Sequence, residues 1–307
     1  MTQTRRRRRP YPLLILAAVL VVMSVVALRL LPGSPLAAQA AAEWESPTAA
    51  ATSGAPRAGA PSAEALTASP SPTLPPLAVR PAAVKIDASG WWSWALVDTR
   101  TGTLSGPSSN SKTSTTASLI KAWIGADFLR RAHEASETPS DQRMAQLSTM
   151  IRDSDNNAAE SLFDAVGRTD SIKRLISICK LKDGSASSAG GWSRTMLSPA
   201  DIARMGACIA DGRAAGPKWT KWLINEMRQV RGTGDFGMRK AFPPDVQRTI
   251  AIKNGWIDRQ AEQEYHVSCL AIGDGWVIGV MARYAINKGY TYGAQICQEV
   301  GEQLRAT

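Results

Sequence analysis

The feature that most limits how this chain can fold is a long low-complexity segment near its N-terminus. Residues 33–82 are dominated by alanine, proline, serine, threonine and glycine, and Trp44 is their one aromatic residue. Such a composition cannot bury enough apolar surface to offset the entropy lost when a chain becomes ordered. We therefore expect residues 32–83 to form a disordered linker and residues 84–307 to form the folded domain.

The segment ahead of this linker has the pattern of a membrane anchor. Five consecutive arginines, residues 5–9, precede an apolar run over residues 13–28. The basic residues place a tail of residues 1–12 in the cytoplasm, with residues 13–31 crossing the membrane and the C-terminal domain outside the cell. The alternative is a cleaved signal peptide and a secreted protein, since small residues follow the apolar run.

The charge distribution narrows the possible partners. The formal net charge is +10, and the first 90 residues hold nine basic and four acidic residues, so the C-terminal domain is only mildly basic. An exported, mildly basic domain argues against nucleic-acid binding. It is compatible with weak attraction to the anionic polymers of a cell wall.

All four cysteines lie in the part that we expect to be exported, where disulfides persist. Their spacings do not match those of metal-binding knuckles. Three pairings are possible, and we favour Cys179–Cys208 and Cys269–Cys297 because each would join neighbouring elements. Buried free thiols are the alternative.

Hydrophobic periodicity after residue 84 predicts a mixed domain of helices and strands. The expected strands are residues 91–98, followed by a hairpin turn at 99–102, then 248–253, 263–272 and 276–284. The expected helices are 118–132, 140–152, 156–166, 169–178 and 290–304, with two more that begin at Pro199 and Pro217. This order predicts an α+β fold, in which an antiparallel sheet is flanked by terminal helices and an all-helical lobe is inserted between its strands.

The sequence offers few residues for catalysis by histidine or by a metal ion. The two histidines, His133 and His266, lie in sequence surroundings that are typical of surface or half-buried side chains, which does not favour a Ser-His-Asp triad. No group of histidines and carboxylates has metal-ligand spacing. We therefore predict neither a metal nor a cofactor.

Lysine is the remaining candidate for a general base. Ser118 and Lys121 share one face of a helix, and the apolar neighbours of Lys121 favour burial, which lowers the pKa of an ammonium group. Ser154-Asp155-Asn156 offers a hydroxyl that can relay a proton and an amide that can bind substrate. Lys253-Asn254-Gly255 offers a second cation for an anionic group, next to a glycine that lets substrate lie flat against a strand.

These three motifs, in this order, resemble the S-x-x-K, S-D-N and K-T-G elements of class A β-lactamases and penicillin-binding proteins. Flanking residues strengthen the resemblance, namely Thr116-Ala117, Met150-Ile151 and Asn157-Ala158-Ala159. The resemblance covers residues 85–305 and implies a β-lactamase/transpeptidase-like fold. It also implies a role for each residue of the three motifs.

By this resemblance, Ser118 is the nucleophile that accepts the acyl group, Lys121 is its base or proton shuttle, and Ser154 relays the proton to the leaving nitrogen. Asn156 would hold an amide of the substrate and Lys253 its carboxylate. The adjoining Asn254, Gly255 and Trp256 would complete the substrate-binding strand. The backbone N–H groups of Ser118 and Trp256 would form the oxyanion hole. We expect Asp155 to be structural, with its carboxylate turned toward backbone donors.

The sequence also departs from the family pattern. Asn254 stands where the middle threonine of K-T-G is expected. The E-x-x-L-N element, whose glutamate activates the water that releases the acyl group in class A β-lactamases, is not found before Ser198, where Asp183 is the one acid of residues 180–197. Only 36 residues separate Ser118 from Ser154, fewer than in the β-lactamases, so one wall of the cleft is shortened.

The sequence therefore predicts an exported, membrane-tethered serine hydrolase that forms an acyl-enzyme at Ser118. It does not determine the oligomeric state, for which we favour a monomer. The partners of the hydrolase would be β-lactams or D-Ala-D-Ala-type peptides of the cell wall, with slow release of the acyl group. A closely related hypothesis is a true β-lactamase that releases the acyl group by an unusual step. The alternative from another class is a non-catalytic sensor or scaffold that binds peptidoglycan or β-lactams.

Overall fold

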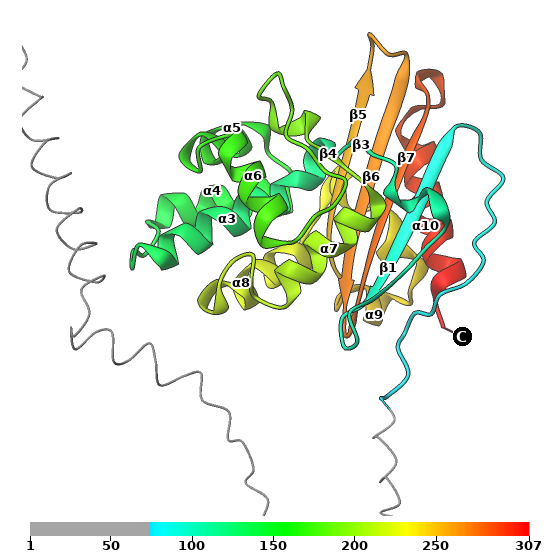
Figure 1. The fold of residues 1–307 in the computed structure, drawn as a ribbon, viewed down its shortest axis with the longest axis horizontal. Helices are drawn as coiled ribbons and strands as arrows, with labels where there is room; N and C mark the ends of the chain where they lie inside the picture. Colours follow the sequence, from blue (N-terminus) through cyan, green and yellow to red (C-terminus); the bar gives the residue numbers. More distant parts are fainter. Residues whose placement is uncertain (1–73, 307) are drawn as a thin grey trace, which may run out of the picture. The chain divides into compact units, whose positions relative to one another are not determined.

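The computed structural model describes residues 74–306, and a five-stranded antiparallel sheet forms their centre (Figure 1). The strand order in this sheet is β2-β1-β7-β6-β5. Its strands are β1 (Trp91–Asp98), β2 (Thr103–Ser105), β5 (Ala251–Arg259), β6 (Glu264–Gly273) and β7 (Trp276–Ala285). A separate short pair is formed by β3 (Ser114–Thr115) and β4 (Met196–Leu197).

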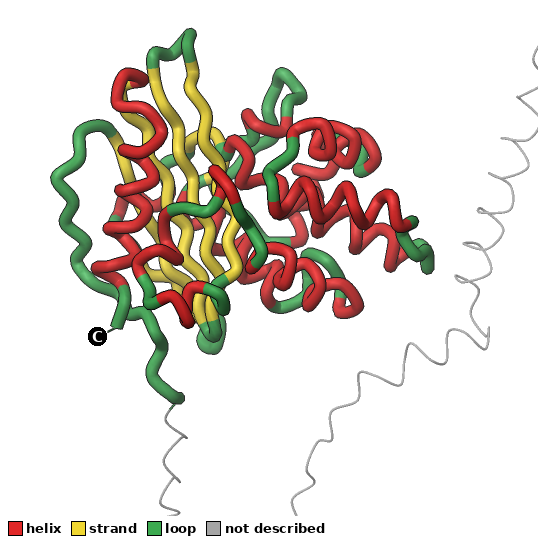
Figure 2. The backbone as a smooth tube through the Cα atoms, turned by 180° about the vertical axis from the view of Figure 1, so that it is seen from behind, coloured by secondary structure: helices red, strands yellow, loops and turns green. Residues whose placement is uncertain are grey.

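Helices occupy the chain between β2 and β5 and its C-terminal end. They are α3 (Lys121–Glu134), α4 (Asp141–Arg152), α5 (Asn156–Ala165), α6 (Thr169–Ile178), α7 (Pro199–Ala210), α8 (Pro217–Arg228), the short α9 (Pro244–Gln247) and α10 (Gly289–Leu304). Figure 1 shows α3, α4, α5, α6 and α8 gathered in a lobe beside the sheet. Helix α7 packs on one face of the sheet, and α10 lies over the other face, as Figure 2 shows from behind.

The expected α+β fold, with a helical lobe inserted between strands of an antiparallel sheet, is therefore confirmed. One detail is corrected, because α10 is the one terminal helix among the described residues. Residues 74–90 contain no helix, and Pro75, Pro76 and Pro81 explain why, since proline disrupts helical hydrogen bonding.

The boundary expected at residue 84 is also corrected. Val79 is buried and forms a bridge with Arg305, and the Arg80 N–H donates to the Leu304 carbonyl at 2.8 Å. The end of the expected linker is thus attached to the domain. The tail of residues 1–12, the anchor of residues 13–31 and the linker up to residue 73 lie outside the described residues. Within residues 74–306, no helix combines the length and hydropathy needed to cross a bilayer.

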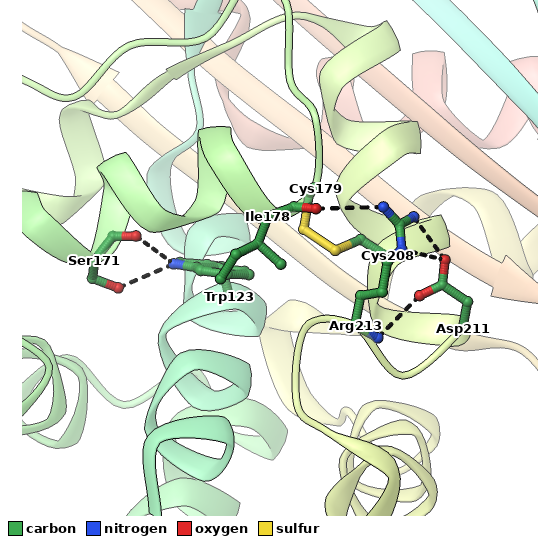
Figure 3. Close-up of a disulfide and its surroundings, with 7 residues drawn as sticks. All are labelled: Trp123, Ser171, Ile178, Cys179, Cys208, Asp211 and Arg213. Atoms are coloured by element: carbon green, nitrogen blue, oxygen red, sulfur yellow. Dashed lines mark hydrogen bonds and ion pairs between the residues drawn. A yellow bond between two sulfur atoms is a disulfide. The ribbon is translucent and has the colours of Figure 1, made fainter. Parts of the chain in front are cut away.

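Both favoured disulfides are present. Cys179–Cys208 joins the end of α6 to α7, and Cys269–Cys297 joins β6 to α10. Figure 3 shows the first of them near the indole of Trp123, whose Nε1 donates to the carbonyl and hydroxyl oxygens of Ser171, both at 3.0 Å. Closing a loop of 29 residues stabilises a fold by about 3.5 kcal/mol in the chain-entropy model.

Strand β5 differs from its expected bounds in a way that affects the site. Residues 248–253 were expected to form this strand, which would place Lys253 at its end. The observed strand continues to Arg259, because its antiparallel register with β6 extends to the pair Arg259 and Glu264. The Lys253-Asn254-Gly255 motif therefore lies inside the strand. The residues before and after the motif also pair with β6.

Candidate active site

The candidate nucleophile lies in a 3-10 turn, Ala117–Ile120, between β3 and α3. Ser118 is partly exposed, whereas its neighbours Ala117, Leu119 and Ile120 are buried. Ala117 has a φ of 46°, a left-handed conformation that is uncommon for alanine. The turn thus holds the Ser118 hydroxyl at the edge of an otherwise buried segment.

Lys121 is fully buried at the first turn of α3. Its ammonium group donates to the carbonyl oxygen of Ser154 at 2.5 Å, to Ser154 Oγ at 3.3 Å and to Asn156 Oδ1 at 2.7 Å. None of the hydrogen bonds found among the described residues joins it to Ser118. The ammonium group of Lys121 is therefore oriented by Ser154 and Asn156 of the second motif.

Burial sets the proton affinity of this lysine. Loss of hydration lowers the pKa of Lys121 to about 7, and the nearby carboxylate of Asp155 opposes this shift. The ring of Trp192 lies 4.7 Å from the ammonium nitrogen. A lysine with a pKa near neutrality can accept a proton at physiological pH, as a general base must.

The second motif is shaped by its backbone. Ser154 has a φ of 61°, which turns the chain sharply between α4 and α5. Asp155 then caps α5, and its carboxylate accepts a hydrogen bond from the Ala158 N–H at 2.7 Å. The carboxylate of Asp155 is thus turned toward a backbone donor, as the sequence predicted. The cap fixes Ser154 and Asn156 on either side of it.

Lys253 supplies the second amine. Its side chain is fully buried, and its Nζ donates to Ser154 Oγ at 2.9 Å. Burial, together with the positive charge of Lys121, holds the pKa of Lys253 well below its usual value. Two amines therefore converge on a single hydroxyl oxygen, an arrangement that is compatible with the predicted proton relay.

Gly255 brings β5 against the turn that carries Ser118, the candidate nucleophile. A Cβ at this position would lie 2.1 Å from the Thr116 carbonyl oxygen and 2.8 Å from the Ser118 nitrogen. No side chain can be accommodated so close to backbone atoms. The glycine is needed for this close approach, which also brings the backbone of Trp256 near Ser118. The oxyanion hole at the N–H groups of these two residues stays a prediction.

The side chain of Asn254 is directed toward the segment that precedes β5. Its side chain is buried and donates to the carbonyl oxygens of Gly234 and Phe236, at 3.1 and 2.8 Å. It is not among the residues that line the pocket next to Ser118. These contacts support the segment that precedes β5, and the expected role of Asn254 in substrate binding stays a prediction.

The pocket beside Ser118 has a volume of about 250 Å³. Its lining residues are Ser118, Asp153, Ser154, Asn156, Arg231, Gly232, Thr233 and Trp256. Sequence reasoning missed Asp153, Arg231, Gly232 and Thr233. The position of Asp153 directly before Ser154 was a usable signal, whereas nothing in the local sequence marks Arg231.

The loop after α6 places an aromatic residue, and no acid, near Lys121. The indole N–H of Trp192 donates to Glu160 at 2.9 Å, and Glu160 also pairs with Arg168. Asp183 instead accepts a hydrogen bond from the hydroxyl of Ser198 at 2.7 Å. Asp183 therefore supports the start of α7, and Glu160 is engaged by two partners.

The histidines lie outside this constellation. His266 is buried, its Nδ1 is 2.7 Å from the hydroxyl of Thr115, and its Nε2 is 3.0 Å from a carboxylate oxygen of Glu264. His133 is exposed near the end of α3. Neither histidine lines the pocket that contains Ser118.

Residues 144–306 match the model of the beta-lactamase enzyme family. This region includes the second and third motifs and begins after Ser118 and Lys121. The putative lipoprotein LppW of Mycobacterium tuberculosis is 29% identical over 203 residues, which span 64% of this chain and 64% of that protein. The same values hold for the protein of that name from Mycobacterium bovis.

Solved structures share the fold at low sequence identity. The TLA-3 extended-spectrum beta-lactamase has a TM-score of 0.58 at 14% identity, with 70% of this chain and 94% of that chain covered. A beta lactamase from Xanthomonas campestris has a TM-score of 0.56 at 19% identity, with 71% and 91% covered. The family match, which spans more than half of the sequence, and this shared fold lead to one conclusion: the chain belongs to the beta-lactamase enzyme family.

Proposed function

We propose that this chain is an exported serine hydrolase that forms an acyl-enzyme at Ser118 with β-lactams or D-Ala-D-Ala-type peptides. The observation that carries the proposal is the convergence of Lys121 and Lys253 on Ser154, at the edge of the pocket that contains Ser118. A binding protein has no need for a lysine whose pKa is lowered to about 7 beside a serine.

The chemistry follows from these positions. Neutral Lys121 accepts the hydroxyl proton of Ser118 as its oxygen attacks the amide carbon, and the N–H groups of Ser118 and Trp256 stabilise the oxyanion. The new ester bond forms as the C–N bond breaks. Ser154 passes a proton to the leaving nitrogen, and its own proton is replaced from the lysines that donate to it. In the complete acylation step, one ester bond forms and one amide bond is cleaved.

Release of the acyl group would be slow. The acids nearest in sequence to the expected water-activating position are engaged elsewhere, because Asp183 contacts Ser198 while Glu160 contacts Trp192 and Arg168. The ring of Trp192 also covers one side of Lys121. Water must therefore be activated by Lys121 or Ser154, or the adduct persists.

The proposed location is the outer face of a cell membrane. The arginine run and apolar segment of residues 5–31 support a single-pass anchor, and the relatives that the chain matches are named putative lipoproteins. Two disulfides are typical of a domain that folds outside the reducing cytoplasm. Cell-wall peptides would then be the substrates within reach.

The test is a mass spectrum of the full chain after incubation with benzylpenicillin. We expect a mass increase of one penicillin molecule, which is lost in Ser118→Ala and kept in Ser111→Ala, a serine on an exposed turn. Absence of both an adduct and any peptidase activity would contradict the proposal. Binding of a cell-wall peptide that survives Ser118→Ala without a covalent product would favour the non-catalytic sensor instead.

A further inference from the structure

An exposed ion pair lies in the wall of the pocket that contains Ser118. Arg231 Nε is 2.6 Å from Asp153 Oδ1, and Arg231 Nη2 is 2.9 Å from Asp153 Oδ2. Both residues line the pocket, and their side chains are 63% and 38% exposed. The two parallel hydrogen bonds are the geometry with which a guanidinium group holds any carboxylate.

The backbone fixes this arginine in place. The Arg231 N–H donates to the carbonyl of Arg152 at 3.0 Å, which ties the segment after α8 to the end of α4. Arg152 itself is occupied by the buried carboxylate of Glu226. Arg231 is therefore held next to Asp153 by its main chain, and its side chain remains free to exchange partners.

By resemblance to the family, Lys253 was assigned to bind the carboxylate of the substrate. Its position in the structure does not suit this role. Lys253 is fully buried, donates to Ser154 and is not part of the pocket lining. Asn254, at the position of the family threonine, is directed toward two carbonyl oxygens outside the pocket. Among the eight residues that line the pocket, Arg231 is the one with a cationic side chain.

We propose that Arg231 recognises the carboxylate of the substrate and that Asp153 occupies this anion site until a substrate displaces it. The proposal rests on the proposed function, because it concerns the same pocket. An exposed ion pair is only weakly held, so an incoming carboxylate can replace Asp153 at low cost. Asp153 then acts as an internal competitor that selects for ligands with a correctly placed negative charge.

The first experiment measures how the full chain distinguishes an acid from its neutral analogue. The acylation rate is measured with benzylpenicillin and with its methyl ester, in the wild type, Arg231→Gln and Asp153→Asn. We expect Arg231→Gln to slow the reaction of the acid about tenfold and that of the ester less than about twofold, because only the acid uses the charge-assisted hydrogen bonds. Asp153→Asn should speed the reaction of the acid, since it removes the competitor.

A second experiment is independent of acylation. Calorimetry measures equilibrium binding of N-acetyl-D-Ala-D-Ala and of its C-terminal amide to the same three proteins. We expect the wild type to prefer the acid, Arg231→Gln to lose this preference and Asp153→Asn to increase it. These two ligands also test whether a peptide carboxylate, as well as that of a β-lactam, is recognised.

Arg213→Gln is the matched control, since Arg213 forms an ion pair with Asp211 outside this pocket, with side chains that are 48% and 45% exposed. Equal losses for acid and neutral analogue in Arg231→Gln, or an unchanged preference for the acid, would overturn the proposal. So would a wild type that binds acid and amide alike. A wild type that prefers the acid but forms no covalent adduct supports the anion site and contradicts only the proposed acyl-enzyme.

Discussion

Lys121 and Lys253, which are 132 positions apart in the sequence, donate to the same hydroxyl oxygen, that of Ser154. Both amines are fully buried, and burial lowers the pKa of each. Two ammonium groups so close to one oxygen would repel each other, so the arrangement favours loss of a proton. We therefore expect the reactivity of the proposed site to depend on pH.

We predict that acylation of Ser118 slows as the pH falls through about 7, the pKa to which burial lowers Lys121. Below this pKa the lysine is protonated and cannot accept the serine proton, whereas above it the rate levels off. The measurement is the rate of adduct formation with benzylpenicillin as a function of pH. Lys121→Arg should remove the activity over the whole range, because arginine remains charged. A rate that is independent of pH across neutrality would show that Lys121 is not the base.

Trp192 is expected to prolong the lifetime of the adduct. Its ring lies 4.7 Å from the Lys121 nitrogen, and its N–H is held by Glu160. Trp192→Ala should admit water beside Lys121 and speed release about tenfold, which equals about 1.4 kcal/mol in the barrier. Trp192→Phe keeps the ring and should change the rate less. Release is followed by the decay of the adduct in mass spectra, and equal lifetimes in both variants and the wild type would refute this role.

Asn254 is predicted to matter for stability more than for substrate binding. It donates to the carbonyl oxygens of Gly234 and Phe236, and a threonine has only one hydroxyl donor to offer. Asn254→Thr should lower the free energy of unfolding by about 1–3 kcal/mol, as expected when a buried acceptor loses its partner. Urea denaturation measures this loss. An unchanged stability with a weakened affinity for benzylpenicillin would return Asn254 to the substrate-binding residues.

Gly255→Ala should damage both the fold and the site. Its Cβ would lie 2.1 Å from the Thr116 carbonyl oxygen, so the strand and the nucleophile turn must separate. Overpacking of this kind costs about 1–3 kcal/mol of stability, and the displaced Ser118 should react far more slowly. Gly191→Ala is the control, since a Cβ there meets no atom within 4 Å. Denaturation curves and acylation rates are measured for both variants. A Gly255→Ala protein with a normal acylation rate would contradict this prediction.

Local patterns in the sequence were enough to predict several features of the molecule. Hydrophobic periodicity and turn residues located most helices and strands, because those signals depend on neighbours within a few positions. The order of the three motifs predicted the fold, and the cysteine spacings were compatible with the observed disulfides. Burial of Lys121 also followed from the apolar residues on either side of it.

Other features depended on contacts that no local pattern records. Arg231 and Asp153 are 78 positions apart, and a backbone hydrogen bond between the segment after α8 and the end of α4 brings them together. The placement of Trp192 over Lys121 and the inward turn of Asn254 depend in the same way on how loops pack against the sheet. The sequence by itself determined which reactive groups the chain contains and in what order. Only the tertiary structure decided which of them face the pocket, because long-range packing fixes the direction of each side chain.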